Sequence, residues 1–198
     1  MNPIRISAAL AAVIAAASAP AAAATSVPVA RFNSVQLRGG GEVLLRHGPV
    51  QRVTILEGST AFTRIQVRED DGRRNPERLV IDACNAQCPR NYKLRVEIVT
   101  PDVKAVAVSG GGTIRTVGSF QGADSLAVAV NGGGHIDIRS ARPSTVAAAI
   151  NGGGTIFARP EASLAAAIRG GGEIQYWGDP SVVTSVQGGG RVRRGSGN

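Results

Sequence analysis

The sequence predicts an all-β, single-domain parallel β-helix, a solenoid of stacked coils that turn at glycine triplets. The first observation behind this prediction is that Gly-Gly-Gly occurs six times, and the last five triplets begin 22, 20, 18 and 18 residues apart. The second is that an aliphatic residue stands two positions before and two positions after each of these five triplets. A repeat of about 20 residues is typical of solenoids, whose units bury their apolar faces only against neighbouring units.

The N-terminal 24 residues have the pattern of a secretory signal peptide. One cation, Arg5, precedes an apolar run from Ala8 to Ala17, and small residues then lead to a cleavage site before Thr25. The apolar run is too short for a membrane anchor, which needs about 20 residues. We therefore expect residues 1–24 to be removed and residues 25–198 to be exported to the periplasm or the cell exterior, with no transmembrane segment.

The composition is that of a single folded domain. Hydrophobic residues make up 43% of the chain and charged residues 18%, which argues against intrinsic disorder. The 198 residues are too few for two ordinary domains after the signal peptide. We assign residues 25–198 to one β-helical domain.

The two cysteines predict a local disulfide. Cys84 and Cys88 lie between two strand-like runs, and an oxidising compartment favours pairing of such thiols. A redox pair and half of a metal site are the alternatives. A redox motif usually has the C-x-x-C spacing, and a zinc site needs four ligands, whereas His47 and His135 are both remote in the sequence. We therefore predict no metal site and no cofactor.

The segments before the glycine triplets alternate as strands do. In the four units from 125 to 187 every second residue is apolar or small, and a helix would meet three glycines after five or six residues. The alternating sets are Leu126/Val128/Val130, Val146/Ala148/Ile150, Leu164/Ala166/Ile168 and Val182/Thr184/Val186. The triplets then form the corners between strands, where chains stack closely and unusual backbone angles are needed. The predicted corners are Gly110, Gly111, Gly112, Gly132, Gly133, Gly134, Gly152, Gly153, Gly154, Gly170, Gly171, Gly172, Gly188, Gly189 and Gly190.

The β-helix could be left-handed or right-handed. A left-handed hexapeptide helix fits the C-terminal units, because small or aliphatic residues and one proline recur every six residues from Ile150 to Val192. The 22- and 20-residue units break that register. We favour the right-handed form, whose coils vary in length.

The residues between the inward-facing ones form a ladder of small side chains. They are Ala127/Ala129, Ala147/Ala149 and Ala165/Ala167, followed by Val183/Ser185. A flat face of this kind is suited to self-association, to another sheet or to a flat ligand. The alternative is that the N-terminal strands of the chain cover it.

Three segments resemble one known family. The run from Arg31 to Leu45, the run from Leu94 to Gly112, and the repeated Val-Asn-Gly-Gly-Gly and Ile-Asn-Gly-Gly-Gly are similar to the family called putative auto-transporter adhesin, head GIN domain. The resemblance covers about residues 31–192 and implies a β-helical, exported envelope protein. The resemblance implies no catalytic residues.

We predict a non-catalytic binding or adhesion module of the cell envelope. The carboxylates do not recur in one column, as a polysaccharide-active enzyme would need, and His135 and Asp137 are interpreted as an exposed polar pair. The net charge of +8 and the basic run from Arg191 to Arg194 suggest an envelope glycan or another anionic surface polymer as partner. Few aromatic residues accompany the arginines, so nucleic acid is not expected. A polysaccharide-active enzyme and a purely structural envelope protein are the alternatives.

Overall fold

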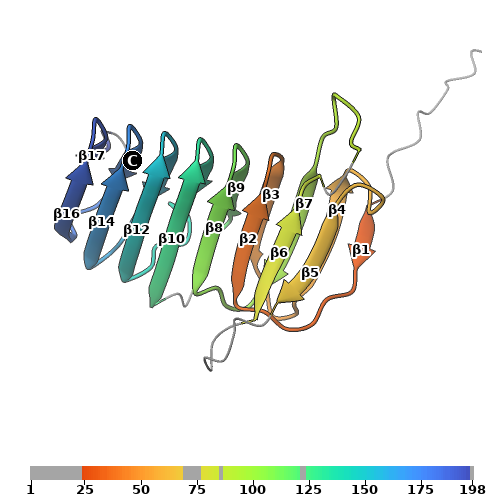
Figure 1. Ribbon diagram of the computed structural model, residues 1–198. Coiled ribbons are helices and arrows are strands. Elements are labelled where there is room, and N and C mark those ends of the chain that lie inside the picture. The colour runs from red at the N-terminus through yellow and green to blue at the C-terminus, as the bar shows by residue number, and fades with distance from the viewer. Residues whose placement is uncertain (1–23, 69–76, 85–86, 121–123, 197–198) are drawn as a thin grey trace, which may run out of the picture.

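The computed structural model of the protein describes residues 24–68, 77–84, 87–120 and 124–196. Apart from Ala24, the predicted signal peptide lies outside these residues, and its cleavage stays a prediction. The described residues form 17 strands in two sheets, one of nine strands and one of eight (Figure 1).

Strand order differs from chain order in both sheets. The nine-stranded sheet has the order β1 (Thr25–Val27), β4 (Arg52–Glu57), β7 (Arg95–Thr100), β3 (Glu42–His47), β9 (Thr113–Val117), β11 (His135–Asp137), β13 (Thr155–Ala158), β15 (Glu173–Tyr176) and β17 (Arg191–Arg194). The eight-stranded sheet has the order β16 (Ser181–Gln187), β14 (Ser163–Arg169), β12 (Thr145–Gly152), β10 (Ser125–Gly132), β8 (Ala105–Ser109), β2 (Ser34–Arg38), β6 (Arg78–Asp82) and β5 (Arg64–Arg68).

The predicted parallel β-helix is wrong, because both sheets are mixed. β4 pairs antiparallel with β1 and with β7, and β5 pairs antiparallel with β6. β2 lies between β6 and β8, and β3 lies between β7 and β9, so the chain does not wind as one series of successive coils. The protein is therefore neither a left-handed nor a right-handed β-helix. The triplet repeat predicts the stacking of the units that contain it, but the segment between the first and second triplets has no such repeat.

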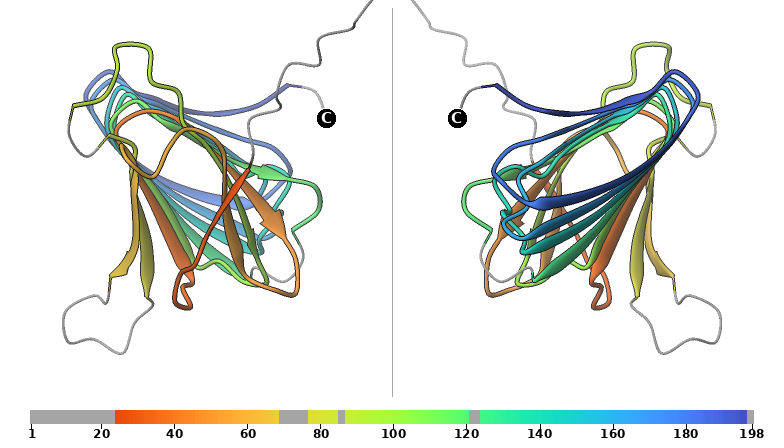
Figure 2. Two further views of the ribbon diagram at one scale, coloured as in Figure 1. Left: turned by 90° about the vertical axis from the view of Figure 1, so that its right-hand side faces the viewer. Right: turned by 90° about the vertical axis from the view of Figure 1, so that its left-hand side faces the viewer.

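The two sheets face each other around one core, as the end-on views in Figure 2 show. Within the repeat, strands pair in parallel and in register, so that equivalent residues of successive units lie side by side. Leu126, Val146 and Leu164 form one such inward column and Ile136, Ile156 and Ile174 another, and each is at most 1% exposed. The period-two pattern thus identified the inward face of these strands correctly.

The glycine triplets lie at the turns that join the two sheets. The first triplet, which starts at Gly39, stacks directly on the second, which starts at Gly110, although the two are far apart in the sequence. Successive corners bond to each other through the backbone, as in the 3.0 Å bond from the Gly153 N–H to the Gly132 carbonyl oxygen. Gly152 has φ +126°, and a Cβ there would lie 2.6 Å from the Gly132 oxygen. Both observations require glycine at that position.

Candidate functional site

The outer surface of the eight-stranded sheet carries two columns of alanine. Because successive residues of a strand point to opposite faces, the residues between the buried Val, Leu and Ile side chains point outward. In-register pairing then aligns them in two columns, Ala105, Ala127, Ala147, Ala165 and Ala107, Ala129, Ala149, Ala167. We call these eight residues the alanine face. The sequence identified six of them; Ala105 and Ala107 were missed, although Val106 and Val108 show the same alternation.

The alanine face is open to solvent. Ala127, Ala147, Ala149, Ala165 and Ala167 are exposed and Ala129 is half-buried. Within the described part of the chain, no strand covers these six residues. The alternative that the N-terminal strands bury this face is therefore wrong for those strands, because β2, β5 and β6 extend the same sheet rather than lying across it.

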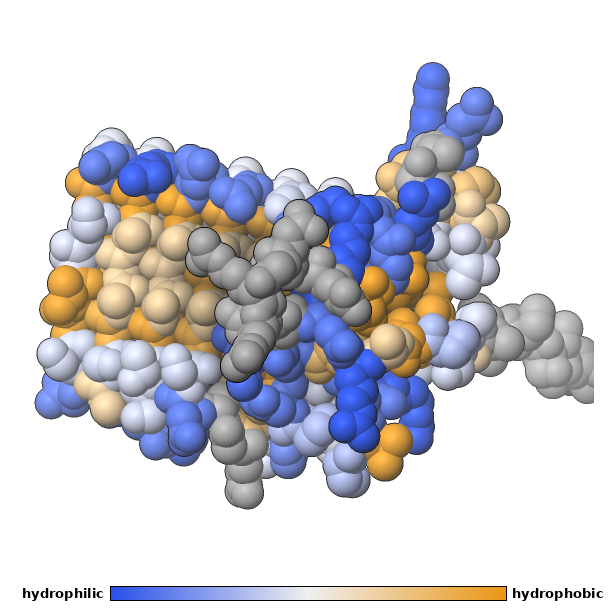
Figure 3. Space-filling model, turned by 60° about the horizontal axis from the view of Figure 1, so that its bottom comes forward, coloured by the Kyte–Doolittle hydropathy of each residue, from blue (hydrophilic) through white to orange (hydrophobic). Residues whose placement is uncertain are grey.

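The face forms the floor of a shallow groove of about 690 Å³. Figure 3 shows it as a pale orange patch between two more polar margins. One margin carries the larger polar side chains Asn131, Asn151, Arg169 and Gln187. The other carries the hydroxyl side chains Ser125, Thr145, Ser163 and Ser181. The groove therefore combines an apolar floor with hydrogen-bonding groups along both sides.

The two ends of the groove differ. At one end the alanine columns continue into Ser34 and Gln36 of β2, with Arg78 of β6 beside them. The hydroxyl oxygen of Ser34 is buried and has no hydrogen-bond partner. At the other end the columns continue into Val183 and Ser185 of β16, and Val183 is 70% exposed. The groove therefore has polar side chains at its β2 end and an exposed valine beside two hydroxyl side chains at its β16 end.

The outer surface of the nine-stranded sheet carries a different cluster. The Arg139 guanidinium donates to both carboxylate oxygens of Asp137, at 2.7 Å from Nη2 and 3.0 Å from Nε. The same guanidinium lies 5.3 Å from the ring centre of Phe157 and 4.9 Å from that of Trp177. The His135 ring packs edge-on against Phe157, with ring centres 4.7 Å apart. The expected pair of His135 and Asp137 is thus part of a packed cluster in which Asp137 bonds to Arg139.

Burial and the charges of this cluster shift the pKa values of its ionisable groups. Burial lowers the pKa of His135 below its usual 6.5; Asp137 opposes this effect, and Arg139 adds to it. Burial acts to raise the pKa of Asp137, but the hydrogen bonds from the Arg139 side chain and backbone outweigh it, and the pKa is lowered from 3.8. The cluster is therefore most stable with His135 neutral and Asp137 ionised.

His135 should make folding stability depend on pH. The unfolded chain binds a proton at a higher pH than the folded chain does, so stability falls as the pH drops below 6.5. Solvent screening limits this effect to about 1 kcal/mol or less. We expect the unfolding temperature to fall more between pH 7.5 and pH 5 in the wild type than in His135→Thr, by up to about 4 °C. Thr stands at the equivalent position of both neighbouring strands, at Thr113 and Thr155. Calorimetry that gave the same fall for both proteins would contradict this prediction.

Most arginines on the same outer surface are paired with carboxylates. Glu42 of β3 accepts from Arg95 of β7 and from Arg115 of β9, both at 2.7 Å. Burial acts to raise the pKa of Glu42, but these two bonds together lower it. In the basic run after residue 190, Arg193 bonds to Glu173 and Arg194 lies 3.5 Å from Asp179. Much of the positive charge of this surface is therefore neutralised within the chain.

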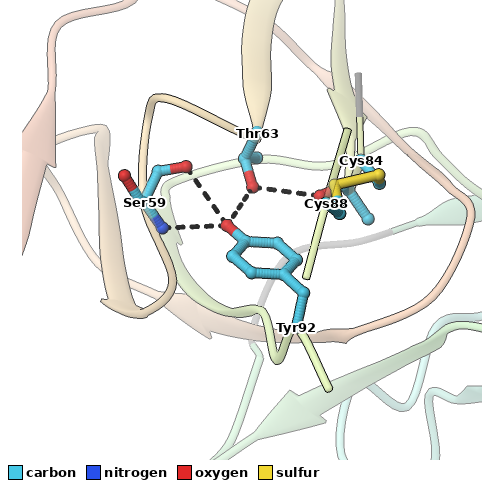
Figure 4. The surroundings of a disulfide bond; sticks show 6 residues. Ser59, Thr63, Cys84, Cys88 and Tyr92 are labelled. Carbon is cyan, nitrogen blue, oxygen red and sulfur yellow. Dashed lines mark hydrogen bonds between the residues drawn. A yellow bond between two sulfur atoms is a disulfide. The ribbon is translucent and has the colours of Figure 1, made fainter. Parts of the chain in front are cut away.

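The predicted disulfide is confirmed between Cys84 and Cys88, whose Cα atoms are 6.0 Å apart. Figure 4 shows the polar network beside it. The Tyr92 hydroxyl accepts from the Ser59 N–H at 2.8 Å and lies 2.7 Å from the Thr63 hydroxyl, which donates to the Ala83 carbonyl oxygen. These bonds join the β4–β5 turn to the segment around the disulfide. The bridge thus lies in a hydrogen-bonded structural region.

Metal ligands and membrane-spanning helices are two further features that bear on function. In the described part of the chain, no group of three or more His, Cys, Asp and Glu side chains is arranged to hold a metal ion. The same residues contain no helix with the length and apolar composition needed to cross a membrane.

Comparisons with known proteins give one family and several similar structures. Residues 31–124 and 121–180 match the family model described as putative auto-transporter adhesin, head GIN domain. A solved structure of a putative adhesin from Bacteroides fragilis NCTC 9343 is similar with a TM-score of 0.52 and 19% identity, over 87% of this chain and 96% of that chain. No curated protein matches the chain. The similarity to the B. fragilis protein supports the fold.

Two further solved structures match at lower TM-scores. A putative adhesin from Parabacteroides merdae ATCC 43184 has a TM-score of 0.38 and 17% identity, over 88% of this chain and 96% of that chain. A putative lipid binding protein from Parabacteroides distasonis ATCC 8503 has a TM-score of 0.34 and 15% identity, over 88% and 96%. Neither the family nor any of these three proteins is named as an enzyme.

Proposed function

Because the chain belongs to the family of putative auto-transporter adhesins with a head GIN domain, we propose that it is a non-catalytic, exported binding module of the cell envelope. The family match confirms the resemblance seen in the sequence. The proposal adds that residues 1–24 direct export, that the protein acts in the periplasm or outside the cell, and that the alanine face is its contact surface.

The observation that carries the proposal is the open apolar groove over the alanine face. The largest apolar patch on a folded monomer, typically about 300–600 Å², is often a functional surface. The volume of the groove, about 690 Å³, is within the range of ligand sites, about 300–1,000 Å³. The residues that line it include no Asp, Glu, His or Cys. General acid–base catalysis relies mainly on such groups, and the hydroxyl side chains in the groove would need one of them nearby as a base to act as nucleophiles, which supports binding rather than turnover.

The dimensions of the alanine face favour a chain-like ligand over a second copy of the protein. Its four strands, about 4.8 Å apart and each contributing about four residues of 3.3 Å, cover roughly 250 Å². A stable dimer buries about 800 Å² on each partner. A linear polymer needs less contact per repeat, because one chain can occupy the groove along its whole length.

The margins of the groove suggest the chemistry of that polymer. Asn131 and Asn151 offer amide donors and acceptors, the hydroxyl margin offers both, and Arg169 offers positive charge. These groups suit a polymer that has hydroxyl groups and scattered anionic groups. We therefore propose an envelope glycan or a similar anionic surface polymer as the ligand.

The test is binding of the purified protein to an array of neutral and anionic envelope polysaccharides. We expect the wild type to bind at least one anionic polymer, and Ala147→Glu/Ala149→Glu to bind it at least tenfold more weakly, because two carboxylates then stand on the groove floor. Thr60→Glu/Ala61→Glu is the matched control, since it adds the same charge at two exposed positions between β4 and β5, away from the groove. Equal loss in both variants, or no binding by the wild type to any polymer, would refute the proposal. Circular dichroism checks that both variants fold.

A further inference from the structure

A second pocket lies among the connections that join the strands. Its volume of about 930 Å³ is larger than that of the groove over the alanine face, and it is within the range of small-ligand sites, about 300–1,000 Å³. Its lining comes from the segment before β2, the β3–β4 turn, the residue before β6, the end of β7 and the connection to β8. None of the lining residues belongs to the alanine face. The pocket is therefore a separate candidate site.

Hydrogen bonds hold the floor of this pocket in place. The Gln51 side chain accepts from the Phe32 N–H at 3.2 Å and donates to the Phe32 carbonyl oxygen at 2.7 Å. The same amide group donates to the Thr100 hydroxyl at 3.1 Å. The backbone of Asn33 is also fixed, since both its N–H and its carbonyl oxygen have backbone partners. A pocket that is ordered in advance loses little entropy when a ligand binds.

The side chain of Asn33 has an acceptor atom without a partner. Asn33 lines the pocket, and its Oδ1 atom is buried and has no hydrogen-bond partner in the described part of the chain. Buried acceptors in folded proteins are nearly always satisfied, because an unpaired one lowers stability. A ligand with an N–H or O–H group can supply the missing donor.

The pocket also has charges of both signs that do not pair with each other. The lining includes two cations and two carboxylates, Arg31, Lys104, Glu77 and Asp102. Among the residues that the structure describes, none of these four side chains forms an ion pair. Most arginines on the outer surface of the nine-stranded sheet, by contrast, bond to carboxylates. Because the four charges of the pocket cancel, it suits a ligand with one positive and one negative group rather than a polyanion.

An apolar wall completes the pocket. Val50 lines it and is 63% exposed, although most aliphatic side chains of the described chain are buried. Pro49 and Pro101 also line the pocket, and their rings limit the motion of both connections. Contact with an apolar group would remove the Val50 side chain from water, which is favourable. This wall therefore suits an aliphatic side chain of a ligand.

We propose that this pocket binds a short peptide with free termini. A peptide has the three kinds of group that the pocket can bind: amide N–H donors for Asn33 Oδ1, opposite charges at its two ends, and apolar side chains. The carboxylates of Glu77 and Asp102 bind the terminal ammonium, and Arg31 and Lys104 bind the terminal carboxylate. The site does not depend on the alanine face or on the polymer proposed for it.

NMR titration of the isotope-labelled protein tests the site directly. The probe is a mixed-sequence library of tripeptides with free termini. We expect it to shift the resonances of Asn33, Val50 and Lys104 and to leave those of Ala147 and Ala165 unchanged. Libraries with an acetylated N-terminus or an amidated C-terminus should bind about tenfold more weakly, because each loses one charged contact. No shift at the pocket with millimolar library, or equal binding of all three libraries, would overturn the proposal.

Two double variants test which charges bind which terminus. Arg31→Gln/Lys104→Gln should bind the free and the amidated library equally, because it lacks the cations that bind the carboxylate. Glu77→Gln/Asp102→Asn should bind the free and the acetylated library equally, because it lacks the groups that bind the ammonium. An unchanged preference in either variant would show that its charges do not contact the peptide, and would overturn the proposal.

Three further variants serve as controls. Arg90→Gln/Lys93→Gln should keep the wild-type preference, since both side chains are exposed and neither lines the pocket. Asn33→Ala breaks no side-chain hydrogen bond within the described chain, so it should keep the wild-type unfolding free energy but bind the free library about tenfold more weakly. A stable Asn33→Ala variant with wild-type affinity would overturn the role of Oδ1 and with it the proposal. Ala147→Glu/Ala149→Glu should bind the library as the wild type does, which separates this site from the groove.

Discussion

Ala148→Glu is expected to prevent folding, whereas Ala147→Glu is expected to leave the protein folded. The Ala148 side chain is 3% exposed and points into the core, between Val128 and Ala166 of the neighbouring strands. A carboxylate there would be buried without a partner, at a cost of several kcal/mol. A domain of this size is stable by about 5–15 kcal/mol in total. Ala147, one residue earlier, points to solvent and has room for a charged side chain.

Circular dichroism and urea unfolding of the two variants measure this difference. We expect Ala148→Glu to lack the β-sheet spectrum of the wild type, and Ala147→Glu to keep its unfolding free energy within about 0.5 kcal/mol, as is usual for an exposed position. A folded Ala148→Glu variant with wild-type stability would contradict the inward direction of this residue. The pair therefore tests the alternation on which both the core and the alanine face depend.

Gly152→Ala is expected to be strongly destabilising, whereas Gly153→Ala should have little effect. Gly152 has φ +126°, and its Cβ would lie 2.6 Å from the Gly132 oxygen of the preceding corner. An L-residue loses about 1–2 kcal/mol in such a conformation, and overpacking adds about 1–3 kcal/mol. We therefore expect a loss of about 2–5 kcal/mol in unfolding free energy. The Cβ of an alanine at 153 would have no atom within 4 Å.

Urea unfolding of both variants and of the wild type gives the comparison directly. Equal losses at positions 152 and 153 would indicate that a triplet matters only through its overall glycine content. A loss confined to position 152 would show that the stacking of one corner on the next is what requires glycine. The same contrast exists at the other corners, for example between Gly170 and Gly171.

The sequence predicted the repeated half of the molecule well, because there each unit pairs with the next. Alternation identified the inward columns, and the spacing of the triplets identified the in-register stacking. The prediction failed for the segment from Arg52 to Asp82, where the antiparallel strands β4, β5 and β6 lie. Alternation shows which face of a strand is buried, but it does not show which strand lies beside it or in which direction. Leu37 and Val43 flank the first triplet at the spacing seen in the other five, but this spacing does not show which strands lie beside it.

The candidate sites were predictable to different degrees. The alanine face follows from alternation within each strand, and in-register pairing completes it. The cluster around Arg139 was missed, since it combines residues of β11, β13 and the segments after β11 and β15. The sequence signal for it is the alignment of the units on their triplets, which places His135 and Phe157 on neighbouring strands. The pocket beside Asn33 could not be recognised, since its lining residues come from connections that are far apart in the sequence.

The insertion of β2 and β3 among later strands has a consequence for the order of folding. Ser34 pairs with Ala105, and Glu42 pairs with Thr113, so each partner is synthesised about 70 residues later. The cost in chain entropy of closing such long loops precedes the contacts that reward it, and topologies of this kind fold slowly. In a chain that is synthesised from its N-terminus, β2 and β3 therefore lack their pairing partners β8 and β9 until those later strands have been made. The C-terminal units, by contrast, can pair one after another with the unit that precedes each of them.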